Sequence, residues 1–360
     1  MRHLITGFLV LVLGLSFVPA GQFVQAQTAY SIVQLTSTAI DDWEPRIDGD
    51  YVVWWNNDNE IYLYDITTAT TTQLLDAIAD GKNPEIDGNY VVWWGNDGND
   101  DEIFLYDIAA ATTTQLTDNT TDDNNPQISG DYVVWPHHDG SDDEIYLYDI
   151  TTGSTAQLTD NTTIDSNPQI NGNYIVWPHH DGDDFEIYLY DITVGTTTQL
   201  TDNTANDEFP QSDGGYVVWM NQDVDDLEIY LYDIASNSTS QLTDNSTNDW
   251  FPQISGDYVV WRGQDTGSGN DIFLYNVATT ATTNLSNTTT LNVEPQIDGD
   301  YVVWHGYDGN DFESFLYNIT TGTTTQLTHN DTDDGNPQIN GRRVVWVSDD
   351  NNNWEIYLAF

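Results

Sequence analysis

The chain of 360 residues contains no cysteine and only six Lys and Arg residues. The lack of cysteine excludes disulfide bonds, so a packed core must hold the fold together. The six cationic residues stand against 59 Asp and Glu, which gives a formal net charge of −53 at pH 7. Such a chain repels phosphate backbones and anionic lipids and attracts cations, so we do not expect nucleic acid as a partner.

The common catalytic motifs are also missing. The sequence contains no nucleophilic Ser-His-Asp elbow, no His-Glu-x-x-His and no glycine-rich phosphate loop. Pairs of carboxylates are so frequent that they do not indicate a catalytic site. We therefore expect a non-catalytic protein. A polysaccharide hydrolase or lyase that holds a metal ion on His137 or His179 is the alternative.

Only one long apolar run is present, from Leu4 to Val18, and the polar residues Arg2 and His3 precede it. It is too short for a transmembrane helix, and small residues follow it up to Ala26. This pattern predicts a signal peptide over residues 1–26. We expect the mature chain to be secreted, on the cell surface or in a periplasm, without insertion into a membrane.

A repeat fills the rest of the chain. The motif Tyr-Val-Val-Trp recurs eight times with small changes, at spacings of 39 to 43 residues. Its tryptophans are Trp54, Trp93, Trp135, Trp177, Trp219, Trp261, Trp304 and Trp346. Repeats of this length are typical of propeller blades and other repeat architectures. We expect the repeated Trp and Tyr residues to form the core.

Each repeat contains four short segments rich in Val, Ile, Tyr, Trp and Thr, separated by Gly, Asn, Asp and Pro. In the third repeat they are 125–128, 132–135, 144–150 and 156–159. No segment has a sustained helical period, so all four are predicted strands. Both faces of the third strand are apolar, as required when a blade lies between two neighbours. The sequence therefore predicts an all-β, eight-bladed propeller with four-stranded antiparallel blades.

The two ends of the repeat array complement each other. Residues 30–36 resemble an isolated fourth strand, whereas the last repeat stops after its third strand at 357–360. Pairing of these segments would remove two free sheet edges. We expect residues 27–360 to form one propeller domain, closed by the N-terminal strand, and to be a monomer.

The repeat resembles a known family. Pro126, Gly130, the strand Ile-Tyr-Leu-Tyr-Asp at 145–149 and Gln-Leu-Thr at 157–159 recur along the chain and are similar to TolB-like propeller repeats, which look like WD-repeat blades. The resemblance implies the fold and a secreted or surface protein. The usual Ser-Pro-Asp-Gly turn is replaced by Ser-Gly-Asp at 129–131, and the extra domain that TolB carries before its propeller has no counterpart after Ala26.

Strand direction determines which loops share a face. The loop after the second strand, 136–143 in the third repeat, should lie on the same face as the link between blades, 159–167. The two tight turns should lie on the opposite face. Because long connections of this scaffold converge on the first face, we expect ligands to bind there.

Four of these loops are acidic and contain an Asp-Gly turn. Carboxylates close together around such a turn are ligands that calcium prefers, although the EF-hand spacing is absent. Calcium is the cofactor we expect, and turn residues on a solvated rim are the alternative. The predicted ligands are Asp97, Asp100, Asp139, Asp142, Asp181, Asp183, Asp308 and Asp311.

Two neighbouring repeats carry a pair of histidines, His137-His138 and His179-His180. Four imidazoles on adjacent blades would suit a borderline metal ion. Consecutive residues of a strand point to opposite sides, so we expect at most His137 and His179 to face a shared ion. Duplication of one blade explains the similarity without a metal.

Other residues at the same loop positions differ from blade to blade. The predicted ligand-face residues are Trp55, Trp94, His138, His180, Arg262 and His305. Aromatic rings beside carboxylates can stack on sugar rings, which makes a carbohydrate-binding protein the second hypothesis. Packing between blades is the other interpretation. The expected partner is therefore a protein or a glycan at a cell surface.

Overall fold

The computed structural model describes residues 30–74, 80–222, 226–264, 269–350 and 353–360. Residues Ser31–Phe360 form one compact unit. The predicted signal peptide lies outside the described residues. Within the described ranges, no helix has the length and apolar character needed to cross a membrane.

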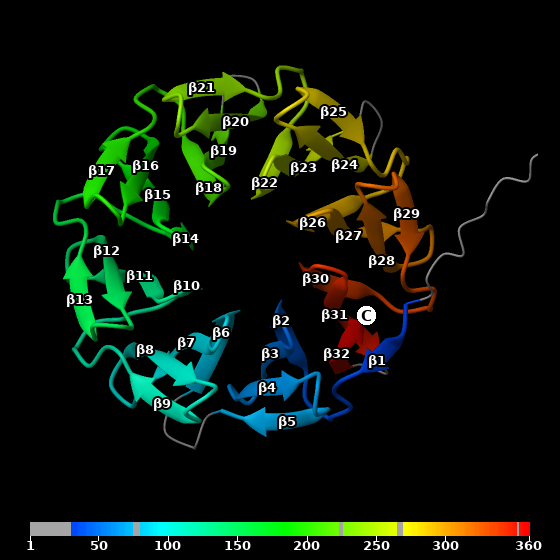
Figure 1. Cartoon of the computed structure of the whole chain (residues 1–360), viewed down its shortest axis with the longest axis horizontal. Coiled ribbons are helices and arrows are strands. Elements are labelled where there is room, and N and C mark those ends of the chain that lie inside the picture. Colours follow the sequence, from blue (N-terminus) through cyan, green and yellow to red (C-terminus); the bar gives the residue numbers. More distant parts are fainter. Residues whose placement is uncertain (1–29, 75–79, 223–225, 265–268, 351–352) are drawn as a thin grey trace, which may run out of the picture. The chain divides into compact units, whose positions relative to one another are not determined.

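The unit is an eight-bladed β-propeller in which every blade is a four-stranded antiparallel sheet (Figure 1). Blades 1 and 2 consist of β2 (Asp42–Asp48), β3 (Tyr51–Asn56), β4 (Ile61–Asp65) and β5 (Thr70–Gln73), then β6 (Asp80–Asp87), β7 (Tyr90–Asn96), β8 (Asp101–Asp107) and β9 (Thr112–Gln115). Blades 3 and 4 consist of β10 (Gln127–Ser129), β11 (Tyr132–His138), β12 (Asp143–Asp149) and β13 (Ser154–Gln157), then β14 (Gln169–Asn171), β15 (Tyr174–His180), β16 (Phe185–Asp191) and β17 (Thr196–Gln199).

The second half of the ring repeats this order. Blades 5 and 6 consist of β18 (Asp207–Asp213), β19 (Tyr216–Gln222), β20 (Leu227–Asp233) and β21 (Ser238–Gln241), then β22 (Asp249–Ser255), β23 (Tyr258–Gln264), β24 (Asn270–Asn276) and β25 (Ala281–Asn284). Blade 7 consists of β26 (Asn292–Asp298), β27 (Tyr301–Tyr307), β28 (Phe312–Asn318) and β29 (Thr323–Gln326). Blade 8 consists of β30 (Asp334–Asn340), β31 (Arg343–Asp350), β32 (Asn353–Ala359) and β1 (Ile32–Gln34).

The core lies between the blades. The eight motif tryptophans are at most 2% exposed, and each residue pair Val-Val or Ile-Val before them is fully buried. Trp177 of blade 4, for example, packs against Val134, Ile145 and Leu147 of blade 3. Both faces of a blade are therefore apolar because both meet a neighbour, as the sequence predicts. The outermost strands, such as β13, are exposed and consist of Ser, Thr, Ala and Gln.

The N-terminal strand completes blade 8, which confirms the predicted closure. β1 pairs antiparallel with β32, with Ile32 opposite Ala359. Beyond the strand, Leu35 N donates to Ile356 O at 2.7 Å and Ile356 N donates to Thr36 Oγ1 at 2.9 Å. Within the continuous blade 3, the same two bonds join Leu158 and Thr159 to Ile145 at 2.8 Å each. Residues 35–36 thus bond to the third strand of blade 8 as residues 158–159 bond to the third strand of blade 3.

A second set of contacts links the blades at the hairpin between their first two strands. The side chain before the hairpin glycine accepts a hydrogen bond from the glycine N–H of the next blade, as in Gly88 N to Asp48 Oδ2 at 2.8 Å. Gly49 N donates to Asn340 Oδ1 at 3.2 Å, so the pattern also crosses the junction of blades 8 and 1. The glycines have positive φ, 52° at Gly49, which other residues adopt only with strain.

The closing strand can be tested with two equivalent substitutions. Thr36→Val and Thr159→Val each leave a backbone N–H of a third strand without its side-chain acceptor, at Ile356 and Ile145. We expect each to lower the free energy of unfolding by about 1–3 kcal/mol, measured by urea denaturation. If Thr36→Val left the free energy of unfolding unchanged while Thr159→Val lowered it, β1 would not close the ring in solution.

Candidate functional site

The acidic loops and the links between blades lie on one face, as predicted. In blade 3, the link that follows the fourth strand returns to the loop before β12, where Asp165 N donates to Asp143 O at 2.9 Å. On the neighbouring strand of blade 4, His180 N donates to Ile164 O of the same link at 2.8 Å. Each loop is thus held against the link that leads to the next blade.

Three carboxylates converge in the loops of four blades. Each loop has the sequence Asp-Gly-x-Asp-x-Glu, and one oxygen from each acidic residue lies within 4.8 Å of the other two. We call these groups the carboxylate triads. They are Asp97, Asp100 and Glu102; Asp139, Asp142 and Glu144; Asp181, Asp184 and Glu186; and Asp308, Asp311 and Glu313.

The local backbone explains why the first two carboxylates meet. In blade 3, Asp139 N donates to Asp142 O at 3.0 Å, and Ser141 N donates to Asp139 Oδ1 at 2.8 Å. The turn requires a φ of 102° at Gly140, which favours glycine. The third carboxylate comes from Glu144 on β12, whose side chain is completely buried.

The buried Glu is anchored by one oxygen only. Asn161 N of the link donates to Glu144 Oε1 at 2.7 Å, whereas Glu144 Oε2 is buried and has no hydrogen-bond partner in the described part of the chain. Asp142 is 7% exposed, and both of its carboxylate oxygens are buried without a partner there. The same holds for Asp100 and Asp311, and for the Oε2 atoms of Glu102, Glu186 and Glu313.

Crowding of these groups disfavours their ionised forms. Burial raises the pKa of Asp142, and the neighbouring charge of Asp139 raises it further. Burial likewise raises the pKa of Glu144, and in blade 7 it raises the pKa of Glu313 to about 7. Backbone N–H donors instead lower the pKa of Asp139. A cation between the three carboxylates would relieve both the repulsion and the missing hydrogen bonds.

The donor set suits a hard divalent cation. Calcium binds carboxylate oxygens at about 2.3–2.6 Å, so one ion can reach three oxygens that lie within 4.8 Å of one another. Nitrogen and sulfur ligands, which zinc and copper favour, are absent from the triads. The remaining coordination positions would fall to water or to a ligand.

The triads include seven of the eight aspartates that the sequence analysis named. The eighth, Asp183, is exposed and lies outside the triad of its loop, which Asp184 completes instead. Sequence reasoning did not name the four glutamates of the triads as candidate ligands. The signal was available, because Glu102, Glu144, Glu186 and Glu313 each follow the second aspartate at the same spacing of two residues.

The histidine pairs have other partners. His137 Nδ1 lies 2.7 Å from Asp123 Oδ1, and His179 Nδ1 lies 2.8 Å from Asp165 Oδ1. His138 is exposed and pairs with Asp143 at 2.9 Å. Among the described residues, the clusters of three or more potential metal ligands contain carboxylates alone. None of these clusters contains an imidazole, and His180 Nδ1 accepts a bond from Gly182 N at 3.1 Å.

The aspartate beside these histidines belongs to a network that recurs around the ring. Asp207 accepts bonds from Trp219 Nε1 at 2.7 Å and from Asn203 and Asn221. In blade 6, Asp249 accepts bonds from Trp261 Nε1 at 2.8 Å and Asn245 Nδ2 at 2.6 Å. The network orients the link and the motif Trp, which is a structural role.

The remaining ligand-face residues lie on strands that pair with the innermost strands of the ring (Figure 1). Trp55 is half-buried and donates to Glu44 Oε2 at 3.1 Å, and Trp94 lies under the Lys82 ammonium at 5.1 Å. Arg262 stacks on Trp250 at 4.4 Å. His305 is 3% exposed, and burial lowers its pKa to about 3.

Two exposed aromatic rings were not among the predicted site residues. Phe209 and Phe251 are 47% and 41% exposed and meet edge to face, with centroids 5.0 Å apart. Both have positive φ, at a position that precedes the strand proline and is Asn or Glu in the other blades.

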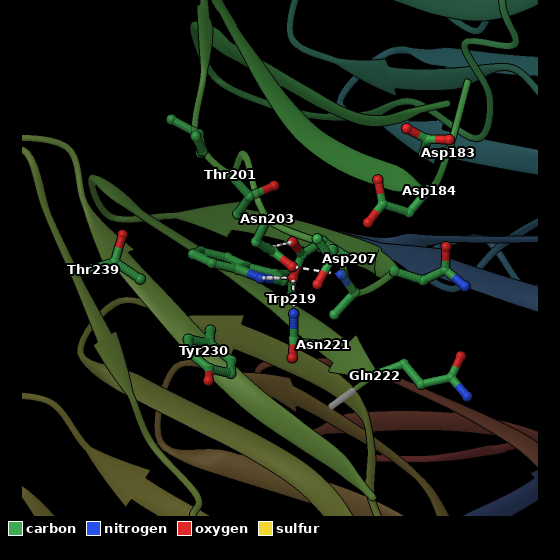
Figure 2. Close-up of a pocket in the computed structure, with 14 residues that line it drawn as sticks. Asp183, Asp184, Thr201, Asn203, Asp207, Trp219, Asn221, Gln222, Tyr230 and Thr239 are labelled. Atoms are coloured by element: carbon green, nitrogen blue, oxygen red, sulfur yellow. Dashed lines mark hydrogen bonds between the residues drawn. The ribbon is translucent and has the colours of Figure 1, made fainter. Parts of the chain in front are cut away.

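A pocket of about 770 Å³ lies beside the triad of blade 4 (Figure 2). It is bounded by Asp183 and Asp184 of the acidic loop, by the link 200–207 and by Asn221, Gln222 and Tyr230 of blade 5. A smaller pocket of about 400 Å³ occupies the corresponding place between blades 5 and 6, next to Asp249 and Phe273.

Comparisons with known proteins identify the fold. No family model and no curated protein matches the chain. Among solved structures, the chain is similar to the computationally designed Ika8 protein, with 17% identity, 90% of this chain and 98% of that chain covered, and a TM-score of 0.67. It is also similar to Porphyromonas gingivalis dipeptidyl peptidase 4, with 12% identity, 89% of this chain and 56% of that chain covered, and a TM-score of 0.59. A third similar structure is an oligogalacturonate lyase in complex with manganese, with 14% identity, 92% of this chain and 97% of that chain covered, and a TM-score of 0.57.

The chain spans about half the length of the peptidase. At these identities the similarities show the fold alone. They agree with the sheet topology, and the chain is a β-propeller.

The buried aspartate network predicts a pH dependence of stability. Burial raises the pKa of Asp249 to about 6, above its ordinary value of about 4 in the unfolded chain. The folded state then holds the proton of Asp249 more tightly than the unfolded chain does. The stabilisation that this proton gives to the folded state is therefore complete below pH 4 and is lost as the pH rises through 6.

A double variant of blade 6 that carries the residues of blade 7 tests the contribution of Asp249 to the pH dependence of stability. There Asn292 replaces the aspartate and keeps the bond from Trp304 Nε1 at 3.1 Å, while Thr288 replaces the link asparagine. In chelator, we expect the double substitution Asp249→Asn with Asn245→Thr to flatten the pH profile of the free energy of unfolding between pH 4 and 6 by an amount on the order of 3 kcal/mol. An unchanged slope in urea titrations would contradict the raised pKa.

Proposed function

We propose that the protein is a calcium-binding propeller, a non-catalytic binding module that acts outside the cytoplasm. Its loop face holds one Ca²⁺ in each of the four carboxylate triads. The observation that carries this proposal is the convergence of three carboxylates at the same loop position in four blades, where the glutamate Oε2 is buried without a hydrogen-bond partner among the described residues. Burying charged groups without partners is costly, so an arrangement repeated four times indicates a ligand that satisfies them.

Calcium fits this site better than other common ions. Magnesium requires nearly octahedral geometry at about 2.0–2.1 Å and gives up its waters reluctantly, whereas calcium accepts six to eight oxygens in flexible geometry. Carboxylates on an Asp-Gly turn and a neighbouring strand provide such a flexible set. The net charge of −53 also raises the local concentration of cations at the surface. The export signal predicted over residues 1–26 would place the protein where calcium is abundant.

Calcium would act by joining the loop to the link. Glu144 bonds through Oε1 to Asn161 of the link, and its Oε2 remains for the ion that Asp139 and Asp142 share. An ion at this point therefore ties three segments of the loop face together. We propose that the face ordered in this way contacts a protein or a glycan at a cell surface. The resemblance of the repeats to TolB-like blades supports a role of this kind.

Calorimetric titration tests the proposal. Wild-type protein treated with chelator should bind about four Ca²⁺, with dissociation constants of about 10⁻⁴–10⁻³ M, as extracellular calcium modules do. Asp142→Asn should remove one binding equivalent. The matched control is Asp143→Asn, because Asp143 lies next to the triad but outside it, and its side chain is 43% exposed.

Thermal unfolding gives a second readout. At a calcium concentration of 100 times the dissociation constant, each occupied site adds about 2.7 kcal/mol to the free energy of unfolding. The melting temperature of the wild type should therefore rise with calcium at constant ionic strength. Absence of binding heat, or a rise equal to that given by sodium at the same ionic strength, would contradict the proposal.

A further inference from the structure

We propose that the pocket between blades 4 and 5 binds a neutral sugar residue in a calcium-dependent way. This inference rests on the proposed function, because the pocket adjoins the triad of blade 4. Asp184 belongs both to that triad and to the wall of the pocket. Glu186 of the same triad is completely buried, and its Oε2 has no hydrogen-bond partner among the residues described. A ligand in the pocket therefore has an ion site at its edge.

Part of the pocket's volume lies where the two preceding blades carry an imidazole ring. In blades 3 and 4, the residue opposite the buried aspartate is His137 or His179, and its ring packs edge-on against Tyr146 or Tyr188, with centroids 4.8 and 4.9 Å apart. Blade 5 has Asn221 at this position, beside the equivalent Tyr230. The volume that an imidazole fills in the two preceding blades is open here.

The wall of this pocket is held in place by hydrogen bonds. Asp207 is fully buried and accepts bonds from Trp219 Nε1, from Asn203 Nδ2 and from Asn221 Nδ2. Figure 2 shows that the nitrogen of Asn221, which lines the pocket, points toward Asp207 and that its carbonyl oxygen points away from Asp207. A wall fixed in this way loses little conformational entropy when a ligand binds.

The chemistry of the wall suits a sugar. Side-chain amides and hydroxyls of Asn221, Gln222, Thr201 and Thr239 surround the pocket, together with the ring of Tyr230. Amides and hydroxyls act as both donors and acceptors, as sugar hydroxyls do, and an aromatic ring packs against the apolar face of a sugar. Adjacent hydroxyls can also supply oxygen ligands to an ion beside Asp184.

The charge of the wall determines which sugars bind. Its acidic lining residues are Asp183, Asp184 and the buried Asp207, and none of the described residues that line it is Lys or Arg. An acidic sugar would therefore be repelled, whereas a neutral one would not. The ligand class is a neutral saccharide with adjacent hydroxyl groups.

Saturation-transfer NMR on the full mature chain tests this inference, with the methyl glycosides of glucose, galactose, mannose and N-acetylglucosamine as probes and glucuronate as the acidic comparison. In calcium, we expect signal transfer to at least one neutral glycoside and at least 10-fold weaker binding of glucuronate. Excess chelator should abolish the transfer to the neutral sugar.

The variant Asn221→His separates the sugar site from the calcium sites. It installs the residue that blades 3 and 4 carry naturally, with Asp207 available as the partner that Asp165 is for His179, so the fold should tolerate it. It should weaken sugar binding at least 10-fold and leave the number of bound calcium ions unchanged. Asp184→Asn should remove one calcium ion and the sugar signal together.

The outcomes distinguish the two proposals. If calcium binds as expected but no neutral glycoside gives transfer in calcium, the sugar site is wrong and the calcium sites stand. Sugar binding that survives chelator, or that is unchanged in Asn221→His, also overturns the sugar site. Absence of calcium binding in the titration overturns the proposed function itself.

Discussion

The structure depends on the packing of each blade against its neighbours. A sheet whose two faces are both apolar is stable only when both are covered, and each motif Trp supplies the contact to the preceding blade. A row of such blades would leave one uncovered face at each end. Closure removes both, and Trp54 of blade 1 packs against Val345 and Ile356 of blade 8 as the other tryptophans pack on their neighbours. The closing strand β1 and the hairpin bond from Gly49 to Asn340 add to the same junction.

This arrangement leaves the loop face free to vary. The core is formed by strands, and the links are fixed by the buried aspartate networks, so the loop between the second and third strands can carry other chemistry. Four blades use it for a carboxylate triad that is anchored to the link through one glutamate oxygen. Blade 5 keeps the same anchored glutamate, Glu228, whose Oε2 is also buried without a partner in the described part. The proposed binding chemistry is thus added to a scaffold that does not require it.

The fold could be predicted from the sequence because every repeat has the same alternation of strand-forming and turn-forming residues. Eight copies of one pattern average out local ambiguity, and the complementary ends indicated the closure. Asp149, which ends the third strand of blade 3, holds the following turn, since its Oδ1 accepts a bond from Thr151 N at 2.8 Å. The triads could be predicted only in part. Asp-Gly turns are visible in the sequence, but Glu144 looks like the first residue of a strand, and its burial depends on the link that crosses over it.

The pocket lay beyond sequence reasoning for a similar reason. The change from His179 to Asn221 is plain in an alignment of the repeats, but its effect depends on the space between a link, a loop and the next blade. The histidines drew attention as metal ligands, whereas in the structure their Nδ1 atoms pair with buried aspartates. Blade 5 differs from blades 3 and 4 in lacking such a ring, but so do the other blades, and the sequence alone therefore does not indicate a pocket at this blade.

The most direct measurement of the central claim is long-wavelength anomalous diffraction from crystals grown in calcium chloride. The account predicts anomalous peaks in blades 2, 3, 4 and 7, each between the two aspartates and the glutamate of a triad, with ion-to-oxygen distances of about 2.3–2.6 Å. Maps without peaks at the triads in calcium-saturated crystals, or with peaks only at exposed carboxylates, would contradict it.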